Sequence, residues 1–188
     1  ILHVLNDILL NDRKVVVEFG SGLSTIIISK FIKINKLSVD FFSIDDNQEW
    51  QELILKELKK YQCADKVQMS YCEIKELDNT KLSCLNNMFW YSLNKLEKVK
   101  DKITNNIDLL LVDGPSIGSS IFNRYPALPY LQDKLSNNVA IYLDDTRRNG
   151  EKEILYKWNE LLNGEIQFEK MHGTIVKGVH FSCRPLSH

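Results

Sequence analysis

Short apolar runs alternate with longer amphipathic segments along most of the chain. Five runs rich in β-branched and aromatic residues predict buried strands, at 15–19, 39–44, 67–72, 107–112 and 139–143. Apolar residues three or four apart predict helices at 1–10, 23–36, 48–61, about 87–100, 127–135 and 151–162. Such alternation is typical of an α/β fold, in which helices cover both faces of a mainly parallel sheet.

The last part of the chain departs from this alternation. Residues 165–170 and 179–183 are strand-like, and the short stretch between them contains Gly173 and Gly178. This stretch is too short for a helical crossover, so the two segments should pair antiparallel. We therefore expect one domain over residues 1–188, with about seven strands and a closing hairpin.

Unusual clusters follow four of the predicted strands. They are Gly20-Ser21-Gly22, Asp45-Asp46, Asp113-Gly114-Pro115 and Asp144-Asp145. In open α/β sheets, ligands bind beyond the carboxyl ends of the strands, where all four clusters should lie. The sequence therefore predicts a binding site at this edge of the sheet.

The first cluster forms a strand–loop–helix unit. Gly20 and Gly22 let a ligand approach the backbone, and the helix that follows offers free N–H groups. Thr25 occupies the third position of the dinucleotide motif G-x-G-x-x-G, so that motif is not met. Asp45, or Asp46 in its place, can accept the hydroxyls of a ribose. The alternative is a plain turn and helix cap. If the loop is functional, Gly20→Val should abolish cofactor binding and leave a folded protein.

Taken in order, these motifs resemble the class I S-adenosylmethionine-dependent methyltransferases, in particular a bacterial small-molecule group with E-F-G-S-G-x-S-T, D-G-P and L-D-D motifs. The resemblance runs from about residue 12 to 184. It rests on residues 18–25, Ser43-Ile44-Asp45 with Trp50, Asp113-Gly114-Pro115, Arg124 with Pro126-Ala127, and Leu143-Asp144-Asp145 with Arg148.

The resemblance implies a Rossmann-like three-layer sandwich with strand order 3-2-1-4-5-7-6 and an antiparallel terminal strand. It also implies the cofactor S-adenosyl-L-methionine. The loop residues Glu18, Gly20, Ser21 and Gly22 would line its methionine end, and Ser24 and Thr25 would also bind the cofactor. Asp45 with Asp46 would hold its ribose, Tyr71 and Cys72 would lie near its adenine, and Asp113 would complete the cofactor site.

Acceptor chemistry is expected at Asp113, Asp144 and Asp145, the candidate catalytic residues, because their strands should be neighbours. One hypothesis is that the three carboxylates bind Mg²⁺, which would lower the pKa of an acceptor hydroxyl. The alternative pairs Asp144 or Asp145 with Arg124, Arg147 or Arg148 and leaves Asp113 to shape the pocket. Without a metal, a carboxylate of the cleft or a histidine such as His172 or His180 would be the base.

Composition narrows the function further. The chain has 188 residues, 24 Lys and Arg against 25 Asp and Glu, and no block of one charge, which disfavours nucleic acid as a partner. Its apolar runs are too short for a bilayer, and its four cysteines lack zinc spacing, so we expect a soluble cytoplasmic protein with reduced thiols. The chain starts inside a predicted helix, so we expect an N-terminal segment to be missing. A homodimer is compatible with the sequence.

The sequence thus predicts methyl transfer from S-adenosylmethionine to a small-molecule acceptor, on a hydroxyl of a sugar or another metabolite. Two alternatives remain open. One is a methyltransferase-like module that binds a nucleoside or a partner protein without turnover. The other is an NAD-dependent oxidoreductase, which Thr25 and the terminal hairpin disfavour.

Overall fold

The structure, a computed structural model, describes residues 1–77, 82–85, 87–116 and 122–184. Its helices are α1 (Leu2–Leu10), α2 (Leu23–Ile34), α3 (Gln48–Lys60), α4 (Leu93–Lys100), α5 (Ala127–Leu131) and α6 (Asn149–Leu162), with 3₁₀ turns at Ala64–Lys66 and Gln132–Lys134. Its strands are β1 (Val15–Phe19), β2 (Asp40–Asp45), β3 (Gln68–Tyr71), β4 (Ile74–Glu76), β5 (Phe89–Tyr91), β6 (Ile107–Val112), β7 (Leu135–Asp144), β8 (Glu165–Phe168) and β9 (His172–Lys177).

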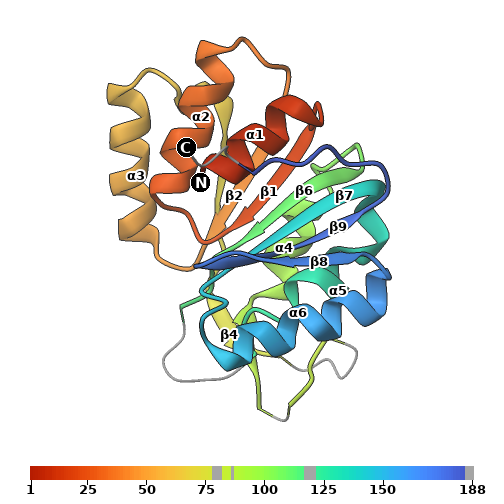
Figure 1. The fold of residues 1–188 in the computed structure, drawn as a ribbon. Helices are drawn as coiled ribbons and strands as arrows, with labels where there is room; N and C mark the ends of the chain where they lie inside the picture. The colour runs from red at the N-terminus through yellow and green to blue at the C-terminus, as the bar shows by residue number, and fades with distance from the viewer. Residues whose placement is uncertain (78–81, 86, 117–121, 185–188) are drawn as a thin grey trace.

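Seven strands form one sheet in the order β3-β2-β1-β6-β7-β9-β8 (Figure 1). Strand β9 runs antiparallel to both β7 and β8, and the other described neighbours are parallel. This confirms the predicted α/β class, the Rossmann-like sandwich and the strand order. Parallel pairing brings the carboxyl ends of β1, β2, β6 and β7 to one edge, which is where the site residues follow.

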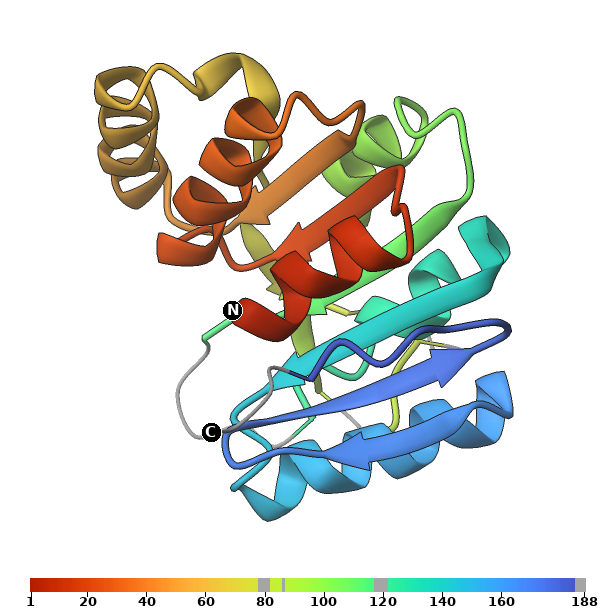
Figure 2. The same ribbon diagram turned by 45° about the horizontal axis from the view of Figure 1, so that its top comes forward.

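Helices cover both faces of the sheet (Figure 2). Alternating side chains of the central strands divide the core, so that Val16 packs with α1 and α2 while Val17 packs with the layer of α4, α5 and α6. Helix α3 packs beside α2 through Ile54 and Leu58. The same alternation turns Glu18 toward α2, where the hydroxyls of Thr25 and Ser43 are buried beside it. No described helix combines the length and apolar character that a membrane crossing requires.

The closing hairpin is present, but its second strand lies earlier than predicted. Strand β9 covers His172–Lys177, whereas the predicted strand at 179–183 has no strand structure. Gly173 lies inside β9, where a Cβ would come within 2.1 Å of Leu155 Cδ1. The absence of a side chain at this position therefore lets α6 pack against the strand. Gly178, with φ of +83°, ends the strand, and the chain then returns over α1, where Asn11 accepts a hydrogen bond from the Phe181 N–H.

The predicted helix at 87–100 is correct only in its second half. Phe89–Tyr91 forms β5, which pairs with β4 in a separate two-stranded sheet, and α4 begins at Leu93. Trp90 and Tyr91 are fully buried in this arrangement. Consecutive bulky aromatic residues favour the extended chain, and this local preference overrode the weaker helical period. The predicted helix at 127–135 likewise ends at Leu131, and β7 starts at Leu135.

Candidate functional site

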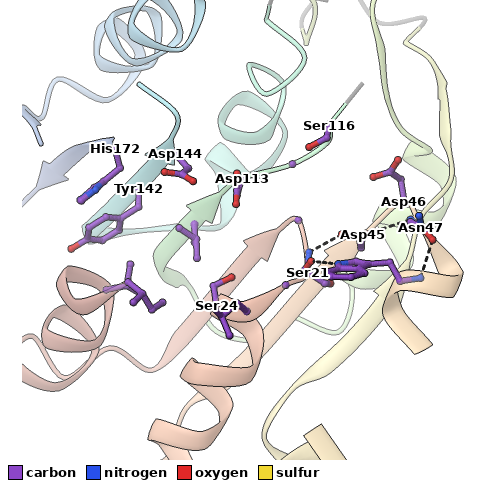
Figure 3. A pocket seen from close by; sticks show the side chains of 18 of the residues that line it. Ser21, Ser24, Asp45, Asp46, Asn47, Asp113, Ser116, Tyr142, Asp144 and His172 are labelled. Atoms are coloured by element: carbon purple, nitrogen blue, oxygen red, sulfur yellow. Dashed lines mark hydrogen bonds between the residues drawn. The ribbon is translucent and has the colours of Figure 1, made fainter. Parts of the chain in front are cut away.

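A cavity of about 520 Å³ opens at the carboxyl ends of β1, β2, β6 and β7 (Figure 3). Ser21, Asp45 and Asn47 lie at one end of it, whereas Tyr142, Asp144 and His172 lie at the other. The full lining is Ile1, His3, Val4, Gly20–Ser24, Asp45–Asn47, Trp50, Leu111, Asp113, Gly114, Ser116, Tyr142, Asp144 and His172. Its size is that of a site for a small molecule or cofactor.

Gly20 and Gly114 bring two loops into backbone contact beneath this cavity. Gly20 has a φ of +95°, and a Cβ there would lie 2.8 Å from the nitrogen of Gly114. A Cβ on Gly114 would lie 2.6 Å from Tyr91 Oη and 2.9 Å from the Gly20 Cα. Both glycines are therefore required by the packing of the protein itself, whatever binds above them.

Gly22 differs from these two glycines. A Cβ at Gly22 would meet no atom within 4 Å, and the residue lines the cavity. Its N–H donates to Thr25 Oγ1 at 2.8 Å, so Thr25 caps the start of α2. Gly22 is thus the position of the loop at which an added side chain would enter space available to a ligand.

Glu18 lies below the loop and outside the cavity lining. Its carboxylate is fully buried and accepts hydrogen bonds from Ser24 Oγ at 2.5 Å and from Thr25 Oγ1 and Ser43 Oγ at 2.6 Å each. Burial raises the pKa of Glu18 to about 7, against the three hydroxyl donors, which lower it. Glu18 therefore ties β1, β2 and the start of α2 together. Of the loop residues expected to bind a cofactor, Gly20, Ser21, Gly22 and Ser24 line the cavity, whereas Glu18 and Thr25 do not.

The raised pKa of Glu18 should make stability depend on pH. Because the folded protein holds this proton more tightly than the unfolded chain, the free energy of unfolding should fall as pH rises from about 4.5 to about 7. In Glu18→Gln this contribution is absent. Urea unfolding at pH 5 and pH 8 should therefore show a smaller loss for the variant than for the wild type. Asp113, whose pKa burial raises to about 6, adds a decline of the same sign in both proteins. Equal losses would contradict the role of Glu18.

Asp45 and Asp46 follow β2 and both line the cavity. The Asp45 carboxylate accepts the backbone N–H groups of Ser21 and Asn47, each at 2.8 Å, which locks the two loops together. Asn47 also caps α3 by accepting the N–H of Trp50. Burial raises the pKa of both aspartates. Asp45 has spare lone pairs for a ligand, and Asp46 presents a second carboxylate beside it. Either aspartate therefore remains a candidate acceptor for ribose hydroxyls.

Asp113, Asp144 and Asp145 converge on Arg124 instead of on a metal site. The Arg124 side chain is 6% exposed, and its Nη2 lies 3.0 Å from Asp113 Oδ1 and 3.4 Å from Asp145 Oδ2. It also donates to the backbone oxygens of Asp113 and Asp144, and Arg148 pairs with Asp145 at 3.1 Å. Only Asp113 and Asp144 line the cavity.

This donor set does not fit Mg²⁺. At Asp113 and Asp145 a bound cation would have to displace the guanidinium that already pairs with these carboxylates, and like charges would oppose it. Among the described residues, the three carboxylates do not form a cluster of ligand atoms within 4.8 Å of one another. The predicted metal site is therefore corrected to an aspartate–arginine cluster, which was the alternative in the sequence analysis.

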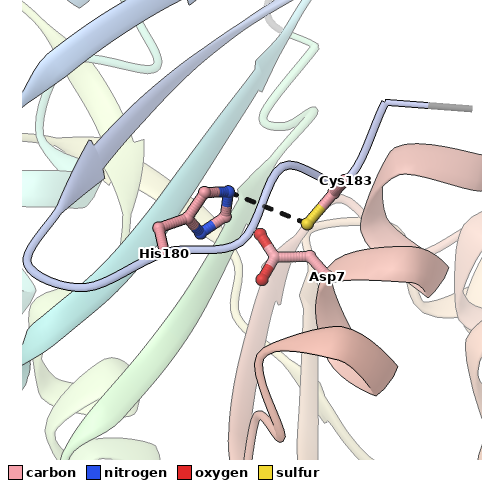
Figure 4. A group of neighbouring side chains, drawn as sticks. All are labelled: Asp7, His180 and Cys183. Carbon is pink, nitrogen blue, oxygen red and sulfur yellow. Dashed lines mark hydrogen bonds between the residues drawn. The ribbon is translucent and has the colours of Figure 1, made fainter.

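A group of possible metal-ligand atoms within 4.8 Å of one another does occur elsewhere, at Asp7, His180 and Cys183 (Figure 4). Here too an arginine supplies the positive charge, because Arg13 Nε lies 2.6 Å from Asp7 Oδ1. Arg13 Nη2 also lies 3.0 Å from His180 Nδ1, and Tyr142 Oη donates to Asp7 at 2.7 Å. These contacts attach the C-terminal segment to α1 and leave Asp7 without a free oxygen for an ion.

Tyr71 and Cys72 lie outside the cavity lining. The Lys95 ammonium sits 4.5 Å from the centre of the Tyr71 ring, on the far side of β2 from the glycine loop. Cys72 is buried in the core, and burial raises its pKa to about 11. Their expected place near an adenine therefore has no support from the geometry.

His3 and His172 belong to the cavity and lie 3.0 Å apart, His3 Nδ1 to His172 Nε2. Of the two, only His172 is among the candidate bases predicted from the sequence, and His3 is not among the predicted site residues. No sequence signal joins them, since 169 positions separate them. The helical period of residues 1–10 places His3 on α1, but only the packing of α1 against β7 shows which part of the site it reaches.

The charge of the cavity is one-sided. Four aspartates line it, one of them, Asp113, already paired with Arg124, and its described lining contains no lysine or arginine. The lining residues with this charge are Asp45, Asp46, Asp113 and Asp144. An electronegative cavity with partly desolvated walls favours a cationic ligand over an anionic one.

Comparison with known proteins supports the architecture. No protein-family model matches the sequence, and no curated protein matches it significantly. Among solved structures, the O-methyltransferase TomG from Streptomyces achromogenes, in complex with SAM, matches with 13% identity and a TM-score of 0.61 over 94% of this chain and 78% of that one. The O-methyltransferase from Bacillus cereus in complex with SAH matches with 12% identity and a TM-score of 0.61 over 94% and 79%. A methyltransferase from Geobacter sulfurreducens matches with 14% identity and a TM-score of 0.60 over 94% and 75%. At such identities the similarity establishes the fold.

Proposed function

We propose that this chain is an S-adenosylmethionine-dependent methyltransferase that acts on a hydroxyl of a small molecule. The observation that carries the proposal is an electronegative cavity above a glycine loop, on a fold shared with structures bound to SAM or SAH. The O-methyltransferases among these structures support oxygen as the acceptor atom.

The charge of the cavity separates this cofactor from a dinucleotide. S-adenosylmethionine carries a sulfonium and an ammonium group, and both would find carboxylates among the lining residues. A dinucleotide would instead bring a pyrophosphate to four aspartates. The described lining has no lysine or arginine to pair with it, and Arg124 is already engaged by Asp113 and Asp145. Like charges in a partly desolvated cleft repel strongly, so the oxidoreductase alternative is disfavoured.

The residues present fit this cofactor. Gly22 leaves open space above the start of α2, and Ser21, Gly22 and Ser24 line the cavity at that point. They would hold the amino-acid end of the cofactor, while Asp45 with Asp46 would hold its ribose hydroxyls. When bound, the cofactor supplies an electrophilic methyl group on sulfur. The chain itself contributes orientation and the exclusion of water around the acceptor.

Calorimetric titration of the full chain with S-adenosylhomocysteine tests the proposal, with NAD as the control. We expect S-adenosylhomocysteine to bind and NAD to leave no signal. EDTA should leave the binding unchanged, because Arg124 replaces a metal in this arrangement. Binding of NAD, or no binding of S-adenosylhomocysteine by the folded protein, would contradict the proposal. Binding without turnover of any hydroxyl acceptor would favour the non-catalytic module.

A further inference from the structure

Two histidines form a hydrogen-bonded pair at the end of the cavity away from Asp45. His3 comes from the first turn of α1, and His172 begins β9. Besides the 3.0 Å contact between nitrogens, the rings meet edge to face, with centroids 4.9 Å apart and an interplanar angle of 71°. The contact requires one imidazole nitrogen to donate and the other to accept. One outer nitrogen, His3 Nε2 or His172 Nδ1 according to the tautomer, then carries a free lone pair.

The groups around this pair shift the pKa of the two histidines in opposing directions. Burial lowers the pKa of both histidines, and His3 further lowers the pKa of His172. Arg184 acts in the same direction on His3. Glu169 opposes these effects at both rings, raising the pKa of each, and Asp144 opposes them at His172.

The sheet places one of these carboxylates next to the pair. Asp144 at the end of β7 is the register partner of His172 in β9, and both side chains line the cavity. Tyr142 stands two residues earlier on the same strand, with its ring centroid 5.9 Å from that of His172. Val4 and Leu111 add apolar wall at this part of the lining. An imidazolium formed here would therefore face a carboxylate instead of bulk water.

We propose that the His3–His172 pair is the base that accepts the proton of the acceptor hydroxyl during methyl transfer. The inference rests on the proposed function and adds catalytic residues to it. As the acceptor oxygen forms its bond to the methyl carbon, the bond between that carbon and sulfur breaks and its electron pair stays on sulfur. The hydroxyl proton passes to the free nitrogen of the pair. The products are the methyl ether, S-adenosylhomocysteine and one imidazolium, which later releases its proton to water.

Asp144 then acts as a positioning residue. It does not need to take the proton, because the neutral imidazole pair is the better acceptor at neutral pH. Its carboxylate stabilises the imidazolium that forms. This assignment also removes the need for a metal, since proton removal by the pair activates the hydroxyl directly.

The first test is an NMR titration of the imidazoles in the full chain saturated with S-adenosylhomocysteine. His3→Gln and His172→Gln assign the signals. We expect both rings to be neutral at pH 7 in the wild type, and the pKa of His172 to rise in His3→Gln because a neighbouring positive charge is lost. A ring that is charged at pH 7, or a His172 titration that ignores His3, would overturn the proposal.

The second test measures transfer of a labelled methyl group to phenol, a small hydroxyl probe whose pKa of about 10 keeps it protonated at pH 7. Each single variant should lose about 100-fold in kcat with an unchanged affinity for S-adenosylhomocysteine, as is typical for loss of a general base. The double variant should lose no more than either single one, because the pair acts as a unit. His180→Gln, the same change outside the cavity, should keep the wild-type rate.

These outcomes separate the two levels of inference. A folded wild type that does not bind S-adenosylhomocysteine refutes the proposed function. A wild type that binds it, together with histidine variants that methylate the probe at the wild-type rate, refutes the base and leaves the function intact. If the wild type does not methylate phenol, the NMR titration remains the test, and a ring that is charged at pH 7 refutes the base.

Discussion

Replacement of Arg124 by leucine should lower the free energy of unfolding by about 3 kcal/mol, within the range for removing one partner of a buried charge cluster. The guanidinium is almost fully buried and serves the carboxylates of Asp113 and Asp145 and two backbone oxygens. Without it, these acceptors lose their donor and the aspartates repel one another. Urea unfolding at pH 7 measures the effect.

Arg148→Leu is the matched control. Arg148 pairs with the same Asp145, but its side chain is 64% exposed, so its loss should cost less than about 1 kcal/mol. A similar cost for the two variants would show that Arg124 has no special place in the cluster. If added Mg²⁺ restored the stability of Arg124→Leu, the carboxylates would prefer a metal once the guanidinium is gone.

Gly22→Thr should weaken the binding of S-adenosylhomocysteine by about 100-fold, or about 2.7 kcal/mol, while the free energy of unfolding stays within about 0.5 kcal/mol of the wild type. A Cβ at this position would project into open cavity space with no protein atom within 4 Å, so the added side chain should meet the ligand. Threonine is accepted at the start of a helix about as well as glycine, so α2 should keep its cap. Calorimetry and urea unfolding of the same samples measure the two quantities.

Gly20→Ala provides the contrast and corrects the test that the sequence suggested. Because its Cβ would lie 2.8 Å from the Gly114 nitrogen at a φ of +95°, the variant should lose about 2–4 kcal/mol of stability. Gly20→Val therefore cannot remove a ligand from an otherwise intact protein. Unchanged binding in a folded Gly22→Thr variant would place the cofactor elsewhere.

Local pattern was sufficient for most of the architecture. Strand ends at Phe19, Asp45 and Val112 are visible because apolar runs stop abruptly at glycine or aspartate, and parallel pairing then requires these ends to meet. The closing hairpin was predictable because the segment between the last two strands is too short for a helical crossover. The position of its second strand was not predictable. Gly173 lies inside β9, where Leu155 of α6 leaves no room for a Cβ, and this contact joins residues that are not neighbours in the sequence.

The candidate site was likewise predictable only in part. The sequence by itself determined which loops meet and which of them carry glycine or carboxylate, because these features depend on residue type and on the strand period. Only the tertiary structure decided that Gly20 serves a backbone contact with Gly114, that Arg124 occupies the place expected for a metal, and that His3 meets His172. Each of these depends on distances between atoms far apart in the chain, which packing sets and periodicity does not encode.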